Sequence, residues 1–401
     1  MKRNSAKGVS FVKKIMAKKR FLAGIFFVGA FSAAYFSIPA VSTLKYSSGS
    51  GSDIQAKKSG GEEIKPAPKF VATHVKIPEQ VKAIYMTACV AATPSWREKL
   101  LKMADDTEIN SIVVDIKDYT GTISFEPDNA VLKENSGTGC RVKDMRQFIE
   151  EAHRRGIYVI GRITVFQDPY YTKTHPELAV RSLSTGGIWK DHKGLSFIDV
   201  GAREYWDYII ALSKDSYDAG FDELNFDYIR FPSDGNMKDV NYTWSGTTTK
   251  SVMLGNFFSY LRENLSQTGA ILSADLFGMT TTNTDDLNIG QVLENTLPYF
   301  DYVAPMVYPS HYPPNFNGWK NPNQYVYEVV NFSMSKAVER ALAASTTPLK
   351  LRPWLQDFDY GGNYGEAEVR AQIKATYDAG LTSWMIWDPG NKYTTEAFNK
   401  E

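Results

Sequence analysis

Eight short apolar segments recur along the chain, and polar stretches with a helical pattern lie between most of them. The segments cover residues 81–86, 111–116, 157–165, 223–231, 271–277, 302–308, 349–355 and 383–387. Most have the length and composition of strands that are buried on both faces, as in a parallel sheet. Strand–helix alternation repeated eight times predicts an α/β fold, a closed (β/α)8 TIM barrel that occupies residues 81–401.

Amphipathic stretches supply the helices of this barrel. They cover residues 95–106, 141–155, 204–219, 252–266, 324–344 and 366–379. No complete dinucleotide-binding glycine motif follows a strand, which favours the barrel over an open doubly wound sheet. In such barrels the loops after the strands carry the chemistry, so polar residues at strand ends are the candidate site residues.

The first 80 residues differ in composition from the rest. Residues 1–20 hold eight basic residues and no acidic one, and residues 21–42 hold no charged side chain. A helix of about 20 apolar residues crosses a bilayer, so residues 21–42 are expected to be a transmembrane anchor or a signal peptide. Residues 1–20 would then be a basic cytoplasmic segment, and the remainder extracytoplasmic, either membrane-anchored or secreted. Residues 43–80 are rich in Ser, Gly and Pro and predict a flexible linker.

Charge and cysteine content narrow the possible partners. The chain has 45 basic and 45 acidic residues, and because eight of the basic ones precede residue 21, the rest of the chain is acidic. Nucleic acid is therefore not an expected partner, since its binding depends on basic side chains that neutralise phosphates. The two cysteines, Cys89 and Cys140, could form a disulfide in an exported protein or stay as two free thiols.

The segment 225–232, Asn-Phe-Asp-Tyr-Ile-Arg-Phe-Pro, is the strongest candidate for a catalytic motif. With a period of two, Glu223, Asn225 and Asp227 share one face, which points into the barrel if the intervening apolar residues meet the helices. A buried carboxylate needs a partner, and Arg162 at the end of the preceding strand could supply it. The alternative is an ion pair that only stabilises the barrel.

A second carboxylate, Asp275, stands at the equivalent height on the next strand, in Ser273-Ala274-Asp275-Leu276-Phe277-Gly278. Two carboxylates that face one cleft suit glycoside hydrolysis, in which one attacks or activates water and the other protonates the leaving oxygen. Asp115 and Lys117 are expected to share a face of the second strand. They could bind sugar hydroxyls or form a solvated ion-pair network.

Aromatic and polar residues near the strand ends complete the expected site. Aromatic rings can stack on the apolar faces of pyranose rings, although each ring by itself is more often a packing residue. Asp388 could also cap the turn that follows it. The expected substrate-binding residues, besides those already named, are Asn225, Tyr228, Arg230, Tyr308, Trp354, Gln356, Trp387 and Asp388.

Four segments together carry a resemblance to a known family: residues 225–232 and 273–278, Ala-Pro-Met-Val-Tyr-Pro at 304–309 and Trp-Met-Ile-Trp-Asp at 384–388. Over about residues 80–395 the chain resembles a bacterial family of putative glycosyl hydrolase domains, exported TIM barrels of unknown function. The family is distantly similar to amylase-type glycosidase barrels, in which an Asp that ends strand four is the nucleophile. Asp227 matches that position, but Asn225 replaces the usual Arg, and Asp275 stands where amylases have Glu.

These observations lead to one hypothesis and two alternatives. We expect a glycoside hydrolase of a cell-envelope or extracellular polysaccharide, with Asp227 as nucleophile or base and Asp275 as general acid. Zinc-protease, Cys-x-x-Cys and nucleophile-elbow motifs do not occur, so we expect no cofactor and no metal. The alternatives are a carbohydrate-binding barrel without catalysis and an envelope protein in which the barrel is only a scaffold.

Overall fold

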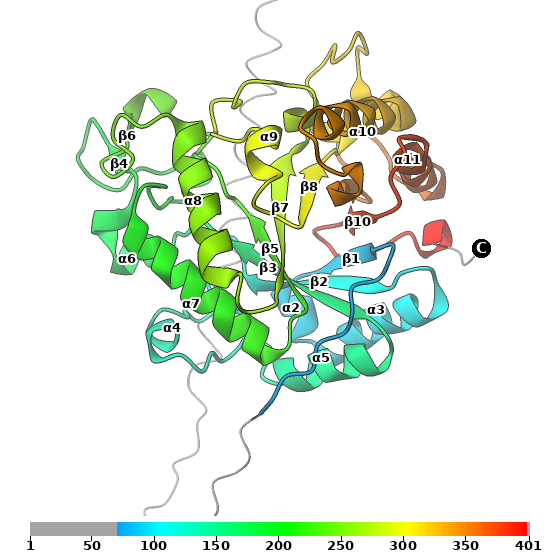
Figure 1. Cartoon of the computed structure of the whole chain (residues 1–401), viewed down its shortest axis with the longest axis horizontal. Coiled ribbons are helices and arrows are strands. Elements are labelled where there is room, and N and C mark those ends of the chain that lie inside the picture. The colour runs from blue at the N-terminus through cyan, green and yellow to red at the C-terminus, as the bar shows by residue number, and fades with distance from the viewer. Residues whose placement is uncertain (1–69, 399–401) are drawn as a thin grey trace, which may run out of the picture. The chain divides into compact units, whose positions relative to one another are not determined.

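The computed structural model describes residues 70–398 (Figure 1). Within these residues, eight parallel strands close into a barrel in the order β1, β10, β9, β8, β7, β5, β3, β2. The strands are β1 (Lys82–Met86), β2 (Ser111–Lys117), β3 (Tyr158–Thr164), β5 (Glu223–Asp227), β7 (Ile271–Phe277), β8 (Tyr302–Met306), β9 (Trp354–Gln356) and β10 (Trp384–Trp387). The predicted TIM barrel is confirmed.

Helices surround the barrel in Figure 1, where α7 lies beside α8 and α10 beside α11. Their apolar faces are buried against the strands, as the periodicity predicted. Helix α7 ends at Gly220, whose φ of 118° is a left-handed conformation that favours glycine. The longer helices are α3 (Pro94–Asp106), α5 (Met145–Arg154), α7 (Arg203–Ala219), α8 (Lys250–Leu265), α10 (Val326–Ala343) and α11 (Glu366–Asp378). Shorter ones are α2 (Ala88–Ala91), α4 (Ala130–Glu134), α6 (Tyr171–Thr174) and α9 (Leu293–Thr296).

Strand β5 shows how alternation places polar groups inside the barrel. Leu224 and Phe226 are buried in the large core between strands and helices. Glu223, on the opposite face, forms an ion pair with Arg352 and accepts a hydrogen bond of 3.2 Å from the Tyr158 hydroxyl. This confirms the predicted faces of the strand and puts two fully buried charges near the amino end of the barrel.

Two segments depart from the expected strands. The fourth segment ends at Asp227 because Tyr228 has a φ of 51°, which turns the chain out of the strand. The seventh was expected at 349–355, but Pro348–Lys350 forms a 3-10 turn and the strand is Trp354–Gln356. A small antiparallel pair outside the barrel, β4 (Arg181–Ser182) with β6 (Val240–Asn241), was not predicted.

The predicted basic segment 1–20, membrane-targeting segment 21–42 and most of the predicted linker lie outside the described residues. In the part of the chain that is described, no helix has the length and apolar character needed to cross a membrane. Residues 70–80 differ from a free linker: the Val75 amide donates a hydrogen bond of 2.8 Å to Asp222. Val75 and Ile77 also pack against the apolar side chains inside the barrel.

A disulfide joins Cys89 of α2 to Cys140, and their Cα atoms lie 4.9 Å apart. It connects the loop after β1 to the segment that precedes α5, and 51 residues separate the two cysteines in the sequence. The bond therefore ties together two loops on neighbouring strands of the barrel.

Candidate active site

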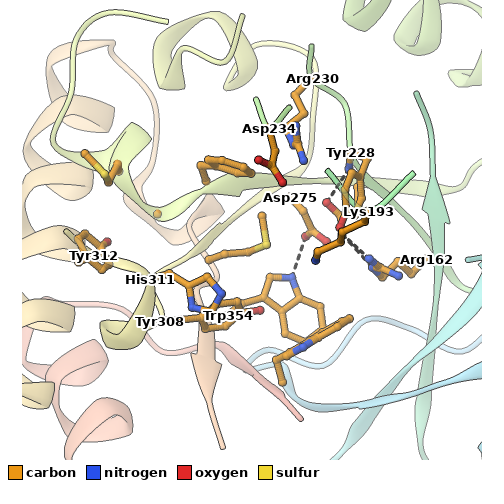
Figure 2. Close-up of a pocket in the computed structure, with 16 residues that line it drawn as sticks. Arg162, Lys193, Tyr228, Arg230, Asp234, Asp275, Tyr308, His311, Tyr312 and Trp354 are labelled. Carbon is orange, nitrogen blue, oxygen red and sulfur yellow. Dashed lines mark hydrogen bonds and ion pairs between the residues drawn. The ribbon is translucent and has the colours of Figure 1, made fainter. Parts of the chain in front are cut away.

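A cavity of about 510 Å³ opens at the carboxyl ends of the barrel strands (Figure 2). Asp227 ends β5, Trp387 ends β10, and Asp275 and Trp354 belong to β7 and β9. The lining residues are Arg162, Lys193, Asp227, Tyr228, Arg230, Asp234, Asp275, Phe277, Gly278, Met279, Met306, Tyr308, His311, Tyr312, Trp354 and Trp387. Six of the predicted substrate-binding residues thus line it together with both predicted catalytic carboxylates.

Arg162 of β3 lies at the centre of a buried ionic network. Its guanidinium donates to Oδ2 of Asp227, from Nη2 at 2.5 Å and from Nε at 3.1 Å. Nη1 donates to Oδ1 of Asp115 at 2.7 Å, and the Tyr85 hydroxyl donates to Oδ2 of the same carboxyl at 2.5 Å. Burial lowers the pKa of Arg162, but the adjacent carboxylates outweigh burial and hold that pKa well above its usual value. The predicted pairing of Arg162 with Asp227 is confirmed.

Asp275 has a different environment, because no cation among residues 70–398 forms an ion pair with it. Asn225 Nδ2 and Trp354 Nε1 donate hydrogen bonds of 2.9 and 2.8 Å, both to Oδ1 of Asp275. Complete burial, reinforced by the nearby charge of Asp227, raises the pKa of Asp275 to about 8 although these donors oppose the rise. A group with this pKa is largely protonated at neutral pH and can donate a proton.

The sheet register brings the two carboxyl groups together. Strands β5 and β7 are paired, with Phe226 opposite Ala274, so Asp227 and Asp275 follow at neighbouring positions. Asn225, two residues before Asp227, donates to Asp275 and also to Ser273 Oγ at 3.1 Å, so it connects β5 to β7. The cavity therefore combines an ion-paired carboxylate with a second carboxyl group that has an elevated pKa.

Tyr228, directly after Asp227, adopts the left-handed backbone conformation that is uncommon for residues other than glycine. Its amide donates a hydrogen bond of 2.6 Å to Oδ1 of Asp227, so the turn also orients the carboxylate. The Arg230 guanidinium lies 4.9 Å from the ring centres of both Tyr228 and Phe277. Backbone strain of this kind tends to occur at functional sites.

Aromatic rings form one wall of the cavity. The rings of Trp387 and Tyr85 stack with centres 3.9 Å apart, and Trp354 meets Trp387 edge to face at 5.5 Å. The Arg162 guanidinium lies 5.0 Å from the Trp387 ring. Figure 2 shows the Trp354 indole directed at Asp275, so this wall also contacts that carboxyl group.

The expectation that Lys117 shares a face with Asp115 is wrong. The β2–β3 register shifts between the two residues, consistent with a β-bulge that turns Lys117 to the other side of the strand. Lys117 is fully buried, pairs with Asp168 at 2.9 Å and donates to the Thr164 carbonyl at 2.6 Å. It therefore supports the structure outside the cavity, while Asp115 lies beneath the lining and holds Arg162.

Three other predicted substrate-binding residues do not line this cavity. Asn225 is fully buried and donates a hydrogen bond to Asp275. Gln356 is also fully buried, and its Oε1 accepts a hydrogen bond of 2.8 Å from Ser310 Oγ. Asp388 accepts hydrogen bonds from the amides of Gly390 and Lys392, at 2.8 and 2.7 Å, and caps its own turn. That turn-capping role was the alternative considered for Asp388.

Several lining residues were not predicted, among them Lys193, Asp234, Met279, Met306 and His311. His311 follows the Tyr308 segment closely, so its position after a strand was a usable signal. Lys193 lies in the long insertion between β3 and α7, which contains no barrel strand, and no local pattern links it to the site. Among residues 70–398, no group of three or more His, Cys, Asp or Glu is arranged to hold a metal ion.

The fold and these motifs place the chain in a family. The chain belongs to the family described as "Putative glycosyl hydrolase domain", whose profile matches residues 83–393. It matches no curated protein.

Two solved structures to which the chain is similar differ in how much of it they match. A hypothetical protein from Ruminiclostridium thermocellum ATCC 27405 is 32% identical over 51% of this chain and 98% of that one, with a TM-score of 0.44. The glycoside hydrolase domain of PgaB (BpsB) from Bordetella bronchiseptica is 14% identical over 81% of this chain and 100% of that one, with a TM-score of 0.59. At that identity the similarity concerns the fold alone.

Proposed function

We propose that this protein is a glycoside hydrolase that cleaves a cell-envelope or extracellular polysaccharide, with Asp275 as general acid and Asp227 as nucleophile or base. The observation that carries the proposal is the contrast between two neighbouring carboxyl groups in one cavity. Asp227 is paired with Arg162, whereas Asp275 is buried without an ion pair to any described residue and its pKa is raised to about 8. A carboxyl group with a raised pKa beside one that is paired with a cation suits the acid and the nucleophile or base of a glycosidase.

The hydrogen bonds of Asp275 support its role as the proton donor. Both hydrogen-bond donors to its side chain, Asn225 and Trp354, donate to Oδ1, and no described residue donates to Oδ2. Neither donor group can accept a proton from Oδ1, so the proton of the neutral acid resides on Oδ2. Because Asp275 lines the cavity, that proton is available to the oxygen of a leaving sugar.

The ionic network supports the role of Asp227. One guanidinium, that of Arg162, is shared between the carboxyl groups of Asp227 and Asp115. Because one guanidinium faces two carboxyl groups, negative charge remains on this side of the cavity. That charge would stabilise the positive charge that develops at the anomeric carbon in an oxocarbenium-like transition state. The short bond from the Tyr228 amide fixes the orientation of the carboxylate before substrate binds.

The lining suits a carbohydrate. Trp387, Trp354 and Tyr308 present ring surfaces, and Arg230, Lys193 and His311 add hydrogen-bond donors. Aromatic faces that stack on sugar rings, with a few polar groups beside them, are the usual composition of such a site.

An extracytoplasmic location is part of the proposal. The disulfide between Cys89 and Cys140 supports it, because such bonds persist in oxidising compartments. The basic residues 1–20 and the uncharged residues 21–42 support export or anchoring. Two measurements on whole cells test this. A thiol-reactive label should not modify Cys89 or Cys140 unless a reductant is added first. Protease added outside the cytoplasmic membrane should reach the barrel.

The test of activity compares wild-type protein with Asp275→Asn and Asp227→Asn. Each is incubated with a panel of bacterial envelope and plant polysaccharides while new reducing ends are measured. We expect release by the wild type and a loss of at least ~10²-fold in each variant. Equal release by wild type and Asp275→Asn would contradict the assignment of the acid.

One observation favours a carbohydrate-binding barrel without catalysis as the second candidate. Both oxygens of Asp227 already accept hydrogen bonds, Oδ2 from Arg162 and Oδ1 from the Tyr228 amide. A nucleophile needs a lone pair directed at the substrate. Two results together would support a binding barrel without catalysis: Asp227→Asn still binds the glycan, and neither the wild type nor either variant releases reducing ends.

A further inference from the structure

A second cavity, of about 740 Å³, lies beside the first. Loops that follow β9 and β10 provide most of its lining, including Phe358, Tyr360 and Tyr364. Lys193 and His311 line both cavities. The two spaces therefore meet at these two side chains and form one cleft across the carboxyl end of the barrel.

A line of aromatic rings connects the two cavities. The His311 ring lies 5.4 Å from the ring of Tyr308, which lines the first cavity. On its other side it lies 5.9 Å from Phe358 and 5.7 Å from Tyr360, which line the second. A run of ring surfaces along one cleft matches the repeating ring faces of a polysaccharide better than it matches a single small molecule.

Tyr360 is the exposed end of this line. The residue is 63% exposed, although its ring is one of the larger apolar groups in the cleft. Its contact with His311 uses only part of the ring, and the rest is open to a ligand. Burial of that surface by a sugar ring would add favourable free energy that the unbound protein does not gain.

The acidic side chains of the second cavity serve mainly to shape its loops. Asp357 accepts hydrogen bonds from the amide and hydroxyl of Thr394, at 2.8 and 2.7 Å. Asp388 accepts from two amides of its own turn. Because these carboxylates already accept hydrogen bonds from the protein, the groups that the second cavity offers a ligand are its aromatic rings and the donors of Lys193 and Lys392.

We infer that the second cavity binds further sugar units of the same polysaccharide whose glycosidic bond lies at Asp275, so that the protein cleaves internal bonds. This inference rests on the proposed function. The occupant is a run of pyranose units that passes Tyr308 and His311 and ends against Tyr360. When a polysaccharide extends through both cavities, the glycosidic bond at Asp275 lies several sugar units from the end of the polysaccharide.

The experiment measures binding separately from cleavage. Full-length Asp275→Asn is run in native gels that contain hydroxyethyl cellulose, soluble starch, xylan or glycol chitosan. For each polymer that slows the migration of the protein, the corresponding disaccharide and hexasaccharide are then titrated into the protein, and their affinities are measured by calorimetry. The substitution Tyr360→Ala is then introduced into the Asp275→Asn protein. The matched control is Trp96→Ala in the same background, because Trp96 is an aromatic residue of the outer helix α3 and lines neither cavity.

We expect the hexasaccharide to bind roughly tenfold more tightly than the disaccharide, because only the hexasaccharide reaches the second cavity. Tyr360→Ala should remove most of that gain and leave disaccharide binding unchanged, and Trp96→Ala should change neither. With a polysaccharide that wild-type protein cleaves, viscosity should fall well before reducing ends accumulate.

Equal affinity for the two oligosaccharides, or equal effects of Tyr360→Ala and Trp96→Ala, would overturn the inference and leave the proposed hydrolase intact. Failure of every polymer to retard the protein would overturn it as well. Equal cleavage by wild type and Asp275→Asn would instead remove the proposed function.

Discussion

The indole nitrogen of Trp354 donates a hydrogen bond of 2.8 Å to Oδ1 of Asp275, although the strands that carry them, β9 and β7, are separated by β8. The bond spans the mouth of the barrel and joins the aromatic wall to the proposed acid. Because the donor favours the charged carboxylate, it limits the rise of the pKa of Asp275 that burial causes. A substitution at Trp354 should therefore change the pH dependence of the reaction.

Wild-type kcat/KM should fall as pH rises through about 8, because Asp275 must be protonated to act as the acid and its pKa is raised to about 8. Above that pH the decline should approach tenfold per pH unit. Initial rates between pH 5 and 10 on a cleaved polysaccharide provide the measurement. A profile that stays level to pH 10 would show that Asp275 is not the acid.

Trp354→Phe should move this alkaline limb to higher pH. The substitution keeps an aromatic ring and removes the N–H that stabilises the charged form of Asp275. Trp387→Phe is the matched control, since Trp387 lines the same cavity and has no hydrogen bond to Asp275 among the described residues. An identical shift in both variants would indicate a general effect of the aromatic wall.

Asp275→Asn should stabilise the fold at pH 8 while it abolishes activity. The folded state holds the proton of Asp275 up to about pH 8, whereas an unfolded Asp loses it near pH 4. The contribution of Asp275 to the free energy of unfolding is therefore fully present below about pH 4. It declines as the pH rises from about 4 to about 8, because the unfolded state then loses a proton that the folded state keeps. We expect a gain of about 1–2 kcal/mol in the free energy of unfolding from urea titrations at pH 8. At pH 4 the same comparison should show a smaller difference.

Arg352→Met should destabilise the barrel by about 3–5 kcal/mol, because it leaves the buried carboxylate of Glu223 without its cation. Both side chains are fully buried at the amino end, far from the proposed chemistry. The double variant Glu223→Leu/Arg352→Met should recover much of the loss, since no buried charge remains. Thermal and urea unfolding of the three proteins test this, and a double variant as unstable as the single one would contradict it.

Removal of the disulfide by Cys89→Ser/Cys140→Ser should cost about 4 kcal/mol, the chain-entropy expectation for a cross-link across 51 residues. The reduced wild type should match the double variant in urea unfolding. Activity at 25 °C should persist, because the bond joins loops whose cysteines do not line the cavity.

The sequence predicted the barrel because each strand is a buried apolar run that can be recognised locally. It also predicted that Asp227 and Arg162 would meet, since both lie near the carboxyl ends of adjacent strands. Lys117 was misplaced because one register shift reverses the side of a strand, and alternation cannot reveal such a shift. Lys193 was missed because it lies in the insertion between β3 and α7, many residues from the end of a barrel strand, and only the fold of that insertion brings it to the cavity. The short strand β9 was displaced by the turn at Pro348–Lys350, in a segment whose apolar composition suggested a longer strand.

The hydrogen bond from Val75 to Asp222 has a practical consequence for preparing the protein. Asp222 also accepts bonds of 2.8 Å from the Val159 amide and from His153, so residues before β1 belong to the same cooperative unit as β3 and α5. At the other end, Phe398 stacks against Trp384. Recombinant truncations cut at the limits of the family match, residues 83 and 393, would remove both interactions and expose apolar surface. The smallest soluble fragment should therefore begin near residue 70 and extend past residue 398.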